Sequence, residues 1–380
     1  MGDPASIRSA QVVLPCAELD PTVAFFVDRL GFRLDAIFPA DDPSVAVLSG
    51  HGSTVRLDRS AEGEPGHLVL LYDEPDEPDE PDEPDDPDES DDPGDHIATR
   101  LVAPNGTVVE LAPADPPVEV PPAVPELVVS HAADTAAWVV GRAGMRYRDL
   151  IPGRLGGSFI ASHIHIPDAG PVPDYVHFHR VRFQMIFCVS GWVRLVYEDQ
   201  GEPFVIEAGD CVLQPPQIRH RVLECSADLE VVEIGCPADH ETIVEHTMEL
   251  PTARTRPDRD FGGQRFTRHI ASRAEWQPWH RSGFEHRDLG IGEATHGLAG
   301  ARVVRTIAPP STERLAHHTE VQFLFVLSGT TTLDTDVSDP APLGPGDAVS
   351  VPGAVRWALR DTSNTLELLD VSLPARVDPR

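Results

Sequence analysis

The sequence predicts a mainly β protein in which a small α+β unit is followed by two tandem copies of a β-rich unit. Three observations support this prediction: a strand–helix–strand–strand pattern near the N-terminus, an internal repeat in the remainder, and two histidine-containing segments with the spacing of short strands and turns. At 380 residues the chain is long enough for two or three compact units.

The first of these units, residues 1–115, begins with a predicted strand at 8–14. Asp20 followed by Pro21 predicts the start of an amphipathic helix, because Asp caps the first turn and Pro lacks only an N–H that is unpaired there. Further strands are predicted at 45–48 and 53–58.

This pattern resembles the vicinal-oxygen-chelate superfamily, which includes glyoxalases and extradiol dioxygenases. The features that carry the resemblance are Asp20, Phe25, Phe26 and the run Leu30-Gly31-Phe32. The resemblance implies metal positions at Gln11, His67 and Glu110, but the fourth position is Arg56, a cation that opposes a metal. Two interpretations stay open: a second metal site, and a degenerate module used for assembly or substrate contact.

An acidic tract interrupts the second half of this unit, where the superfamily pattern has a helix. Residues 73–95 contain 15 acidic side chains and no basic one, with prolines recurring through most of the tract. Proline removes backbone donors and like charges repel each other, so the tract is predicted to be a disordered surface insert.

The remainder of the chain contains one internal repeat. Equivalent residues lie 137 to 139 positions apart, as short loop deletions would produce. The matched pairs are Gly144 with Gly283, Gln184 with Gln322, Gly209 with Gly346, and Pro215 with Pro352. The repeat predicts a first copy at 131–250 and a second at 269–380, each preceded by a linker, at 116–130 (rich in proline) and at 251–268.

The first copy contains the most informative pattern in the chain. His177 and His179 lie two residues apart, so on a strand they face the same side. The pattern continues as H-x-H-x4-Q-x6-G through Gln184 and as G-D-x4-P-x4-H to His220. Its glycines and proline predict the turns that bring His220 towards the first two histidines. Three converging neutral imidazoles suit iron, zinc, copper, nickel or manganese.

These two segments resemble the signature motifs of the cupin family, whose members fold as double-stranded β-helix barrels related to jelly rolls. Together with the repeat, the resemblance implies two tandem cupin barrels, a bicupin. It also implies one divalent metal ion held by His177, His179 and His220. The family motif usually has Glu where this chain has Gln184. Gln184 is therefore expected either to ligate the metal through its amide oxygen or to hydrogen-bond a bound water or substrate.

The second copy has not kept the pattern. His179 corresponds to His317, but His177 corresponds to Leu315 and His220 to Trp357. A single histidine beside an apolar residue and a tryptophan cannot enclose a metal ion. The second barrel is therefore predicted to be structural, with the tryptophan filling the former metal cavity.

Two further side chains join Gln184 as candidate catalytic residues. Tyr175 has the same parity as the motif histidines, which would let it hydrogen-bond a substrate oxygen. His163 and His165 alternate on the preceding strand, so they share one face. A role for His165 behind the metal ligands and a solvent-facing role stay open, because parity does not say which face is inward.

The composition limits the partners. With 62 acidic and 30 basic residues, the net charge of −32 disfavours nucleic acid and anionic membranes as partners. Five scattered cysteines, no long apolar run and no signal-like N-terminus predict a soluble cytoplasmic protein with reduced thiols, and the all-arginine basic set is typical of a high-GC bacterial gene. A homodimer is compatible with the sequence, which does not itself predict an oligomeric state.

Three classes of function remain. The neutral three-histidine set and the family resemblance favour a mononuclear non-haem iron oxygenase, dioxygenase-like, acting on a small anionic or chelating substrate. Fe(II) is the preferred metal, with Mn, Ni, Zn and Cu as alternatives. The other classes are a redox-neutral isomerase or lyase that uses the metal as a Lewis acid, and a non-catalytic bicupin that binds a small molecule. Cupins include all three, so the fold alone does not separate them.

Overall fold

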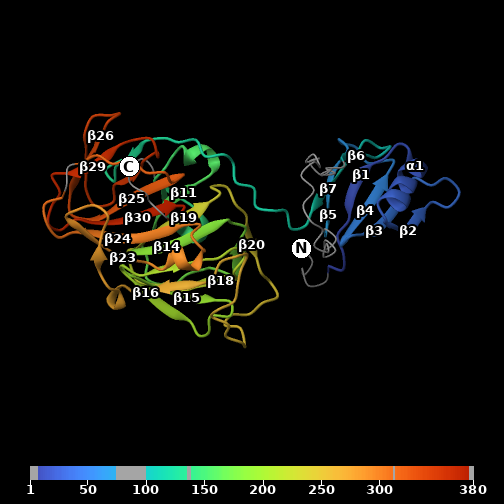
Figure 1. Ribbon diagram of the computed structural model, residues 1–380. Helices are drawn as coiled ribbons and strands as arrows, with labels where there is room; N and C mark the ends of the chain where they lie inside the picture. The colour runs from blue at the N-terminus through green and yellow to red at the C-terminus, as the bar shows by residue number, and fades with distance from the viewer. Residues whose placement is uncertain (1–6, 74–99, 135–137, 311–312, 376–380) are drawn as a thin grey trace, which may run out of the picture. The chain divides into compact units, whose positions relative to one another are not determined.

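The computed structural model describes residues 7–73, 100–134, 138–310 and 313–375 (Figure 1). The chain divides into two compact units, Met1–Pro117 and Val118–Arg380. Of the predicted acidic insert, only Asp73 lies within the described residues. Among these residues no helix is both long and apolar enough to cross a membrane. All five cysteines are free and buried, as the sequence indicated.

The N-terminal unit consists of two sheets and a short helix. One sheet has the strand order β1-β4-β3-β2, and the other has the order β5-β7-β6. The bounds are β1 (Val12–Pro15), α1 (Leu19–Ala24), η2 (Phe25–Arg29), β2 (Arg33–Phe38), β3 (Val45–Gly50), β4 (Ser53–Asp58), β5 (His67–Tyr72), β6 (Arg100–Val102) and β7 (Val108–Pro113). The predicted strand–helix–strand–strand pattern is present, with β2 between the helix and the next two strands.

The helix of this unit begins slightly earlier than predicted. Leu19 is its first residue and Glu18 its N-cap, so Asp20 lies inside the first turn, where its charge suits the helix dipole. Leu19 and Phe26 are completely buried and belong to the same apolar cluster as Leu48 of the sheet. Packing of this apolar face, more than capping, holds the short helix in place.

Residues after 118 form two similar β-sandwiches, each made of a large and a smaller sheet. In the first sandwich the sheets have the orders β21-β17-β14-β19-β11-β10-β9 and β16-β15-β18-β13-β20, with β12 beside β18. In the second they are β22-β23-β24-β30-β25-β28-β8 and β27-β26-β29. Within the described residues no ladder joins the two sheets of either sandwich. Each is therefore an open two-layer version of the predicted barrel.

The elements of the first sandwich are β9 (Trp138–Val140), η4 (Arg142–Gly144), β10 (Arg146–Asp149), η5 (Arg154–Gly157), β11 (Ile160–Ile166), β12 (Gly170–Pro171), β13 (His177–His179), β14 (Phe183–Ser190), β15 (Trp192–Tyr197), β16 (Phe204–Glu207), β17 (Cys211–Leu213), β18 (His220–Cys225), β19 (Leu229–Cys236), β20 (Thr242–Val244) and β21 (Thr267–His269). Those of the second are β8 (Val128–Ser130), η6 (Ala271–Arg273), β22 (Gln277–Pro278), β23 (Phe284–Asp288), α2 (Ile291–Ala294), β24 (Gly300–Thr306), β25 (Val321–Ser328), β26 (Thr331–Thr335), β27 (Ala341–Leu343), β28 (Ala348–Ser350), β29 (Trp357–Arg360) and β30 (Glu367–Leu373).

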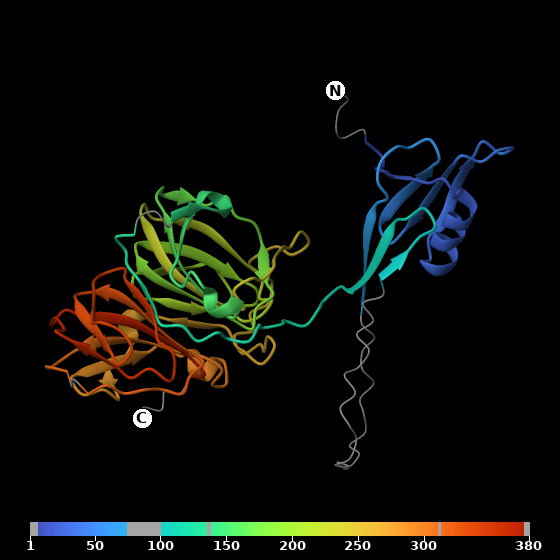
Figure 2. The same ribbon diagram turned by 90° about the horizontal axis from the view of Figure 1, so that it is seen from above.

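Each sandwich receives an edge strand from the segment that precedes the other one. β8 pairs with β28 of the second sandwich, although it precedes the first in the chain. β21 pairs with β17 of the first sandwich, although it precedes the second. The segments 116–130 and 251–268, predicted as linkers, thus both run into exchanged strands. Figure 2 shows the two sandwiches side by side.

Two arginines at equivalent repeat positions make matching contacts between the sandwiches. Arg148 Nη2 donates to the carbonyl oxygen of Gly346 at 2.5 Å. Arg287 donates from Nη1 and Nη2 to the carbonyl oxygen of Gly209, both at 3.1 Å. These glycines have φ values of +84° and +90°, so the glycine–aspartate turns of the two copies share one backbone conformation. The contacts therefore follow the approximate two-fold relation of the repeat.

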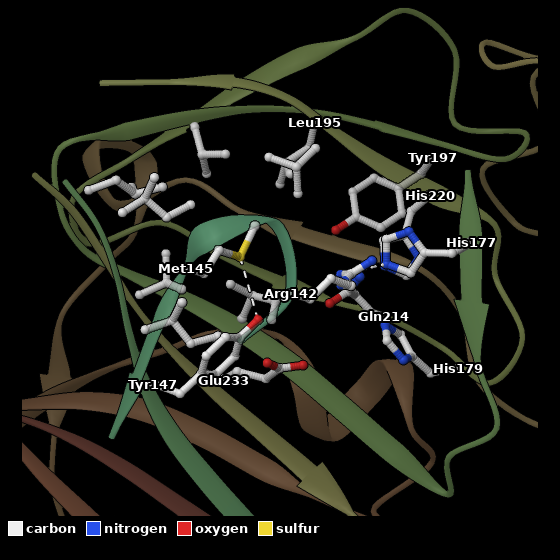
Figure 3. A pocket seen from close by; sticks show the side chains of 17 residues that line it. Arg142, Met145, Tyr147, His177, His179, Leu195, Tyr197, Gln214, His220 and Glu233 are labelled. Carbon is white, nitrogen blue, oxygen red and sulfur yellow. Dashed lines mark hydrogen bonds between the residues drawn. The ribbon is translucent and has the colours of Figure 1, made fainter. Parts of the chain in front are cut away.

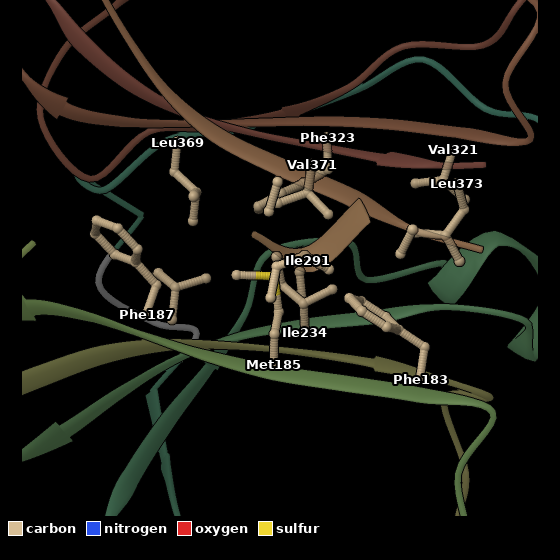
Figure 4. Packing of buried hydrophobic residues seen from close by; sticks show 14 of the residues in the cluster. Phe183, Met185, Phe187, Ile234, Ile291, Val321, Phe323, Leu369, Val371 and Leu373 are labelled. Carbon is tan, nitrogen blue, oxygen red and sulfur yellow. The ribbon is translucent and has the colours of Figure 1, made fainter. Parts of the chain in front are cut away.

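The largest core of this unit lies between the two large sheets (Figure 4). Phe183 and Met185 of β14 belong to one buried cluster with Phe323 of β25 and Val371 of β30. Alternation along the strand explains this packing, because Ile186 points the other way and joins the separate interior core of the first sandwich. The packing between the two sandwiches therefore uses one face of each large sheet, and the opposite face lines the interior of its own sandwich.

Candidate metal centre

Two neighbouring strands bring the three predicted histidines together. His177 and His179 lie on β13, and His220 opens β18 as the cross-strand partner of His177. All three are buried, and one nitrogen from each lies within 4.8 Å of the others (Figure 3). The convergence predicted from the spacing is therefore confirmed.

Hydrogen bonds on the outer side of the rings fix their orientation. The Nδ1 atoms of His177 and His220 lie 2.8 Å and 2.9 Å from the backbone carbonyl oxygens of Tyr175 and Ile218. A carbonyl oxygen only accepts, so Nδ1 carries the proton in both rings and Nε2 carries the lone pair that can ligate a metal. In His177 this Nε2 also lies 3.1 Å from Nη2 of Arg142. His179 is held through Nδ1 by Thr242 Oγ1 at 3.0 Å. Such bonds orient the imidazoles of metal sites.

Burial keeps these rings neutral. It is the largest cause that lowers the pKa of His177, His179 and His220 below the usual value, and charge on neighbouring histidines lowers the pKa of the last two further. Within the described residues no cysteine or carboxylate belongs to the cluster. The donor set therefore fits a borderline divalent ion, which would keep its full charge and its open positions for ligands.

Arg142, which the sequence did not indicate, lies at the edge of the histidine cluster. Its Nη1 donates to Asp174 Oδ1 at 3.0 Å, and its Nη2 lies 3.1 Å from Nε2 of His177. The Asp174 carboxylate is fully buried and also accepts from the backbone N–H of Val222 at 2.9 Å. Asp174 therefore anchors the guanidinium, and Nη2 meets the nitrogen through which His177 would bind a metal.

A cavity of about 90 Å³ lies inside the first sandwich beside the histidines. Figure 3 shows Arg142, Gln214 and Tyr197 near the three rings. The aliphatic part of the wall consists of Ile164, Ile166, Ile186, Val193, Leu195, Val222, Leu229 and Val231. The polar part, besides the histidines, consists of Arg142, Tyr147, Tyr197, Gln214 and Glu233. The cavity thus combines an apolar chamber with a small group of polar side chains.

Gln184, predicted to act at the metal or on its ligands, has a different contact. It is buried on β14, and its Nε2 donates to Glu233 Oε1 of β19 at 2.5 Å. Glu233 lines the cavity and Gln184 does not. Its amide nitrogen thus orients a carboxylate from the neighbouring strand, and a role at the metal or its ligands stays a prediction.

Tyr175 lies at the rim of the site. It is 42% exposed, and its ring centroid lies 5.9 Å from that of His177. The guanidinium carbon of Arg142 lies 5.7 Å from the same ring. Tyr175 thus flanks the histidines and the arginine without lining the inner cavity.

His165 lies on the other face of its strand. Ile164 and Ile166 of β11 line the cavity, so the alternating His163 and His165 face away from it. His165 Nε2 lies 3.2 Å from a carboxylate oxygen of Asp228, and His163 is paired with Glu230 at the same distance. The shared parity was predicted, and of the two roles left open for His165, this placement favours the outward-facing one over a catalytic role behind the metal ligands.

A second cavity of about 550 Å³ adjoins the first. Both cavities are lined by Arg142, Tyr147, His179 and Glu233, so these four side chains form the partition between them. Burial is the largest cause that raises the pKa of the Tyr147 phenol, followed by the charge of Glu233. A neutral phenol and a carboxylate therefore face the route between the two cavities.

The equivalent place in the second sandwich is filled. Leu315 and Trp357 form a bridge that matches the His177–His220 pair. Both ring nitrogens of His317 are used, by Thr319 Oγ1 at 2.7 Å and by the backbone oxygen of Val351 at 3.0 Å. Arg281 stacks on the tryptophan, with 3.9 Å between its guanidinium carbon and the ring centroid. Trp357 is 2% exposed, in agreement with the prediction that it fills this space.

The glyoxalase-like positions of the N-terminal unit do not form a comparable cluster. His67 Nε2 lies 3.2 Å from Glu110 Oε2, and about half of each side chain is exposed. Gln11 is also exposed. Arg56 donates from Nε and Nη2 to Asp58. The one cluster of at least three His, Cys, Asp or Glu side chains with metal-ligand spacing in the described part of the chain is that of the first sandwich.

Comparison with known proteins agrees with this architecture. The family model for the cupin domain (Cupin_2) matches residues 303–372, which lie in the second sandwich. No curated protein matches the chain by sequence. A formate complex of oxalate decarboxylase from Lactobacillus farciminis aligns with a TM-score of 0.50 and 14% identity over 70% of this chain and 91% of that chain.

Oxalate decarboxylase from Bacillus subtilis, in a study of its Mn(II) centres, also aligns with a TM-score of 0.50, at 12% identity over 70% of this chain and 80% of that chain. At such identities the likeness concerns the fold alone. Together with the family model, these matches show that the two sandwiches have a cupin fold.

Proposed function

We propose that this protein is a metal-dependent enzyme that converts a small organic anion inside its first sandwich. The observation that carries the proposal is the set of three buried, neutral histidines whose outer nitrogens are held by hydrogen bonds and whose other nitrogens converge. Within the described residues, His179 and His220 are held through Nδ1 alone, and His177 Nε2 meets the N–H of Arg142, whereas His317 in the second sandwich uses both ring nitrogens on uncharged protein groups.

In this proposal His177, His179 and His220 hold the metal ion. A ferrous ion there would supply electrons to dioxygen and polarise a chelated substrate oxygen. Arg142 binds the anionic group of the substrate, since its Nη2 N–H faces the ligand positions beside His177. The aliphatic wall excludes water from the reacting groups. An oxygenase reaction with iron is our first candidate.

A redox-neutral lyase or isomerase is the second candidate, and Glu233 favours it. Glu233 presents a carboxylate to the cavity, held by Gln184, and Tyr147 stands beside it in the same partition. A carboxylate and a phenol close to a bound substrate can take up and return a proton, which isomerisation and elimination require.

Oxygen uptake separates the two candidates. The protein, loaded with iron or with manganese, would be mixed with a panel of small enolisable acids, with and without dioxygen. Chromatography would then measure the loss of each substrate. The oxygenase assignment predicts loss only with iron and dioxygen, with one dioxygen consumed per product. Loss without dioxygen, retained with manganese and abolished by Glu233→Gln, would replace it by the redox-neutral assignment.

For the N-terminal unit we propose a vicinal-oxygen-chelate-like module without a metal of its own. The strand and helix order and the exposed, partly ion-paired positions of His67, Glu110 and Arg56 support a role in assembly or substrate contact. Metal analysis of the His67→Ala variant tests this proposal. If the N-terminal unit binds no metal, the metal content of the protein will be unchanged.

A further inference from the structure

We infer that the substrate is a short aliphatic carboxylate, whose hydrocarbon part occupies the inner cavity of the first sandwich and whose carboxylate meets Arg142. This inference rests on the proposed function and names the substrate class of the same site.

The wall of the cavity supports an apolar substrate body. Strands from both sheets contribute side chains to it, including Ile164, Leu195, Val222 and Val231. Binding a hydrocarbon group against such a wall removes apolar surface from water on both partners, which favours binding by about 0.8 kcal/mol per methylene. A fully polar substrate such as oxalate gains nothing from this wall.

The size of the cavity limits the hydrocarbon part. Its volume is about 90 Å³. An apolar cavity of roughly 150 Å³ accommodates benzene. The inner cavity is smaller than that, which favours a short hydrocarbon chain over an aromatic ring.

The anionic end of the substrate is assigned by the arrangement of Arg142. Its Nη1 donates to the buried Asp174, while its Nη2, which carries two N–H groups, hydrogen-bonds Nε2 of His177 at the boundary between the two cavities. A ligand entering beside the histidines therefore meets a positioned N–H donor. In the second sandwich the equivalent Arg281 donates to the backbone oxygen of Trp357 and stacks on its ring, and so is not directed at an open cavity.

The test measures the affinity of a homologous series of straight-chain carboxylates. Acetate, propanoate, butanoate, pentanoate and hexanoate, with oxalate as the polar reference, would be titrated calorimetrically into the full-length protein with and without Mn(II). We expect affinity to rise about four-fold for each methylene up to butanoate or pentanoate and then to stop rising. Equal affinities along the series, or oxalate binding more tightly than butanoate, would overturn the inference.

Three variants connect this series to the cavity. Arg142→Met should lower the affinity for every carboxylate by a similar factor of about ten or more. The charge-assisted contact is lost, while the hydrocarbon part of the ligand still packs in the cavity. Val222→Phe, which fills the chamber, should stop the rise at propanoate. Arg281→Met is the matched control in the second sandwich and should leave all affinities unchanged. If Arg142→Met and Arg281→Met behave alike, the assignment of the carboxylate is wrong.

The series also separates this inference from the proposed function. A protein that binds the carboxylates with the expected chain-length dependence but takes up no metal would retain the binding site and refute the enzyme. A protein that binds one metal ion but shows no chain-length dependence would retain the metal centre and refute the substrate class.

Discussion

The large sheets of the two sandwiches have the same strand order, but only the first sandwich brings three histidines together in the described part of the chain. The cross-strand pair at the candidate metal centre is His177 with His220, and its counterpart is Leu315 with Trp357. The strand pairing is retained although two imidazoles are replaced by apolar groups. The same strand pairing therefore accommodates either set of side chains, and the two sandwiches differ here by a few residues on a shared framework.

The carboxylates of the two sandwiches show the same contrast. Gln184 donates to Glu233 in the first sandwich, and Gln322 donates to Asp370 in the second. Asp370 is completely buried and lies 3.5 Å from Arg302, which places it in an ion pair. Position 162, which lies opposite Glu233 as Arg302 lies opposite Asp370, is a serine. Asp370 is therefore paired with an arginine inside the second sandwich, whereas Glu233 faces the cavity of the first.

The shared core provides the largest expected effect. Phe323→Ala should lower the free energy of unfolding of the paired sandwiches by about 3–5 kcal/mol, because it removes a fully buried ring between the two large sheets. Urea unfolding followed by tryptophan fluorescence measures the loss. Val140→Ala, at a position 75% exposed, is the control and should cost less than about 0.5 kcal/mol. A loss below 1 kcal/mol for Phe323→Ala would mean that the sandwiches do not rely on this packing.

The two threonines that contact equivalent histidines sharpen the comparison. Thr242→Val removes the hydrogen bond to His179 and should weaken metal binding about 10- to 100-fold, because a ligand imidazole loses its orienting partner. Thr319→Val removes the matching bond to His317 and should leave the metal affinity unchanged. Competition with a chelator of known affinity provides the measurement. Equal effects would imply a general loss of structure.

Acid should lower the free energy of unfolding of the paired sandwiches through His269, which lies on the exchanged strand β21. Burial, followed by the charge of Arg287, lowers the pKa of His269 on β21 to about 4. The folded protein therefore holds this ring neutral while the unfolded chain, with a pKa near 6.5, binds a proton. Its contribution to stability is complete above about pH 6.5 and is lost as the pH falls towards 4.

His269→Gln tests this pH dependence. Between pH 6.5 and pH 4 the free energy of unfolding should fall less in the variant than in the unsubstituted protein. The reason is that the variant takes up about one proton fewer when it unfolds. Urea midpoints measured across this range provide the check. An unchanged slope would show that other groups cause the acid sensitivity.

The sequence predicted the features that depend on spacing and repetition. The H-x-H pattern placed His177 and His179 on one side of a strand, and the repeat predicted the replacement by Trp357. Alternation does not say which face of a strand points inward, which is why the role of His165 stayed open until Ile164 was seen to line the interior.

The remaining site residues come from elements that carry no motif. Arg142 lies on a short 3₁₀ turn and Glu233 in the middle of a strand, so both reach the cavity only through the tertiary fold. A signal was nevertheless present: Arg142 recurs as Arg281 and Glu233 as Asp370 at the offsets of the repeat. The exchanged strands β8 and β21 have three residues each, too few for a periodic pattern.

Metal stoichiometry decides whether the first sandwich holds a metal. The full-length protein would be loaded with Fe(II) under anaerobic conditions, freed of loosely bound ions by gel filtration and analysed for iron. We expect one tightly bound equivalent per chain, lost in His177→Ala and His220→Ala and retained in His317→Ala. A protein that binds no iron or other divalent ion, or one that keeps its equivalent after His220→Ala, would contradict the proposed metal centre.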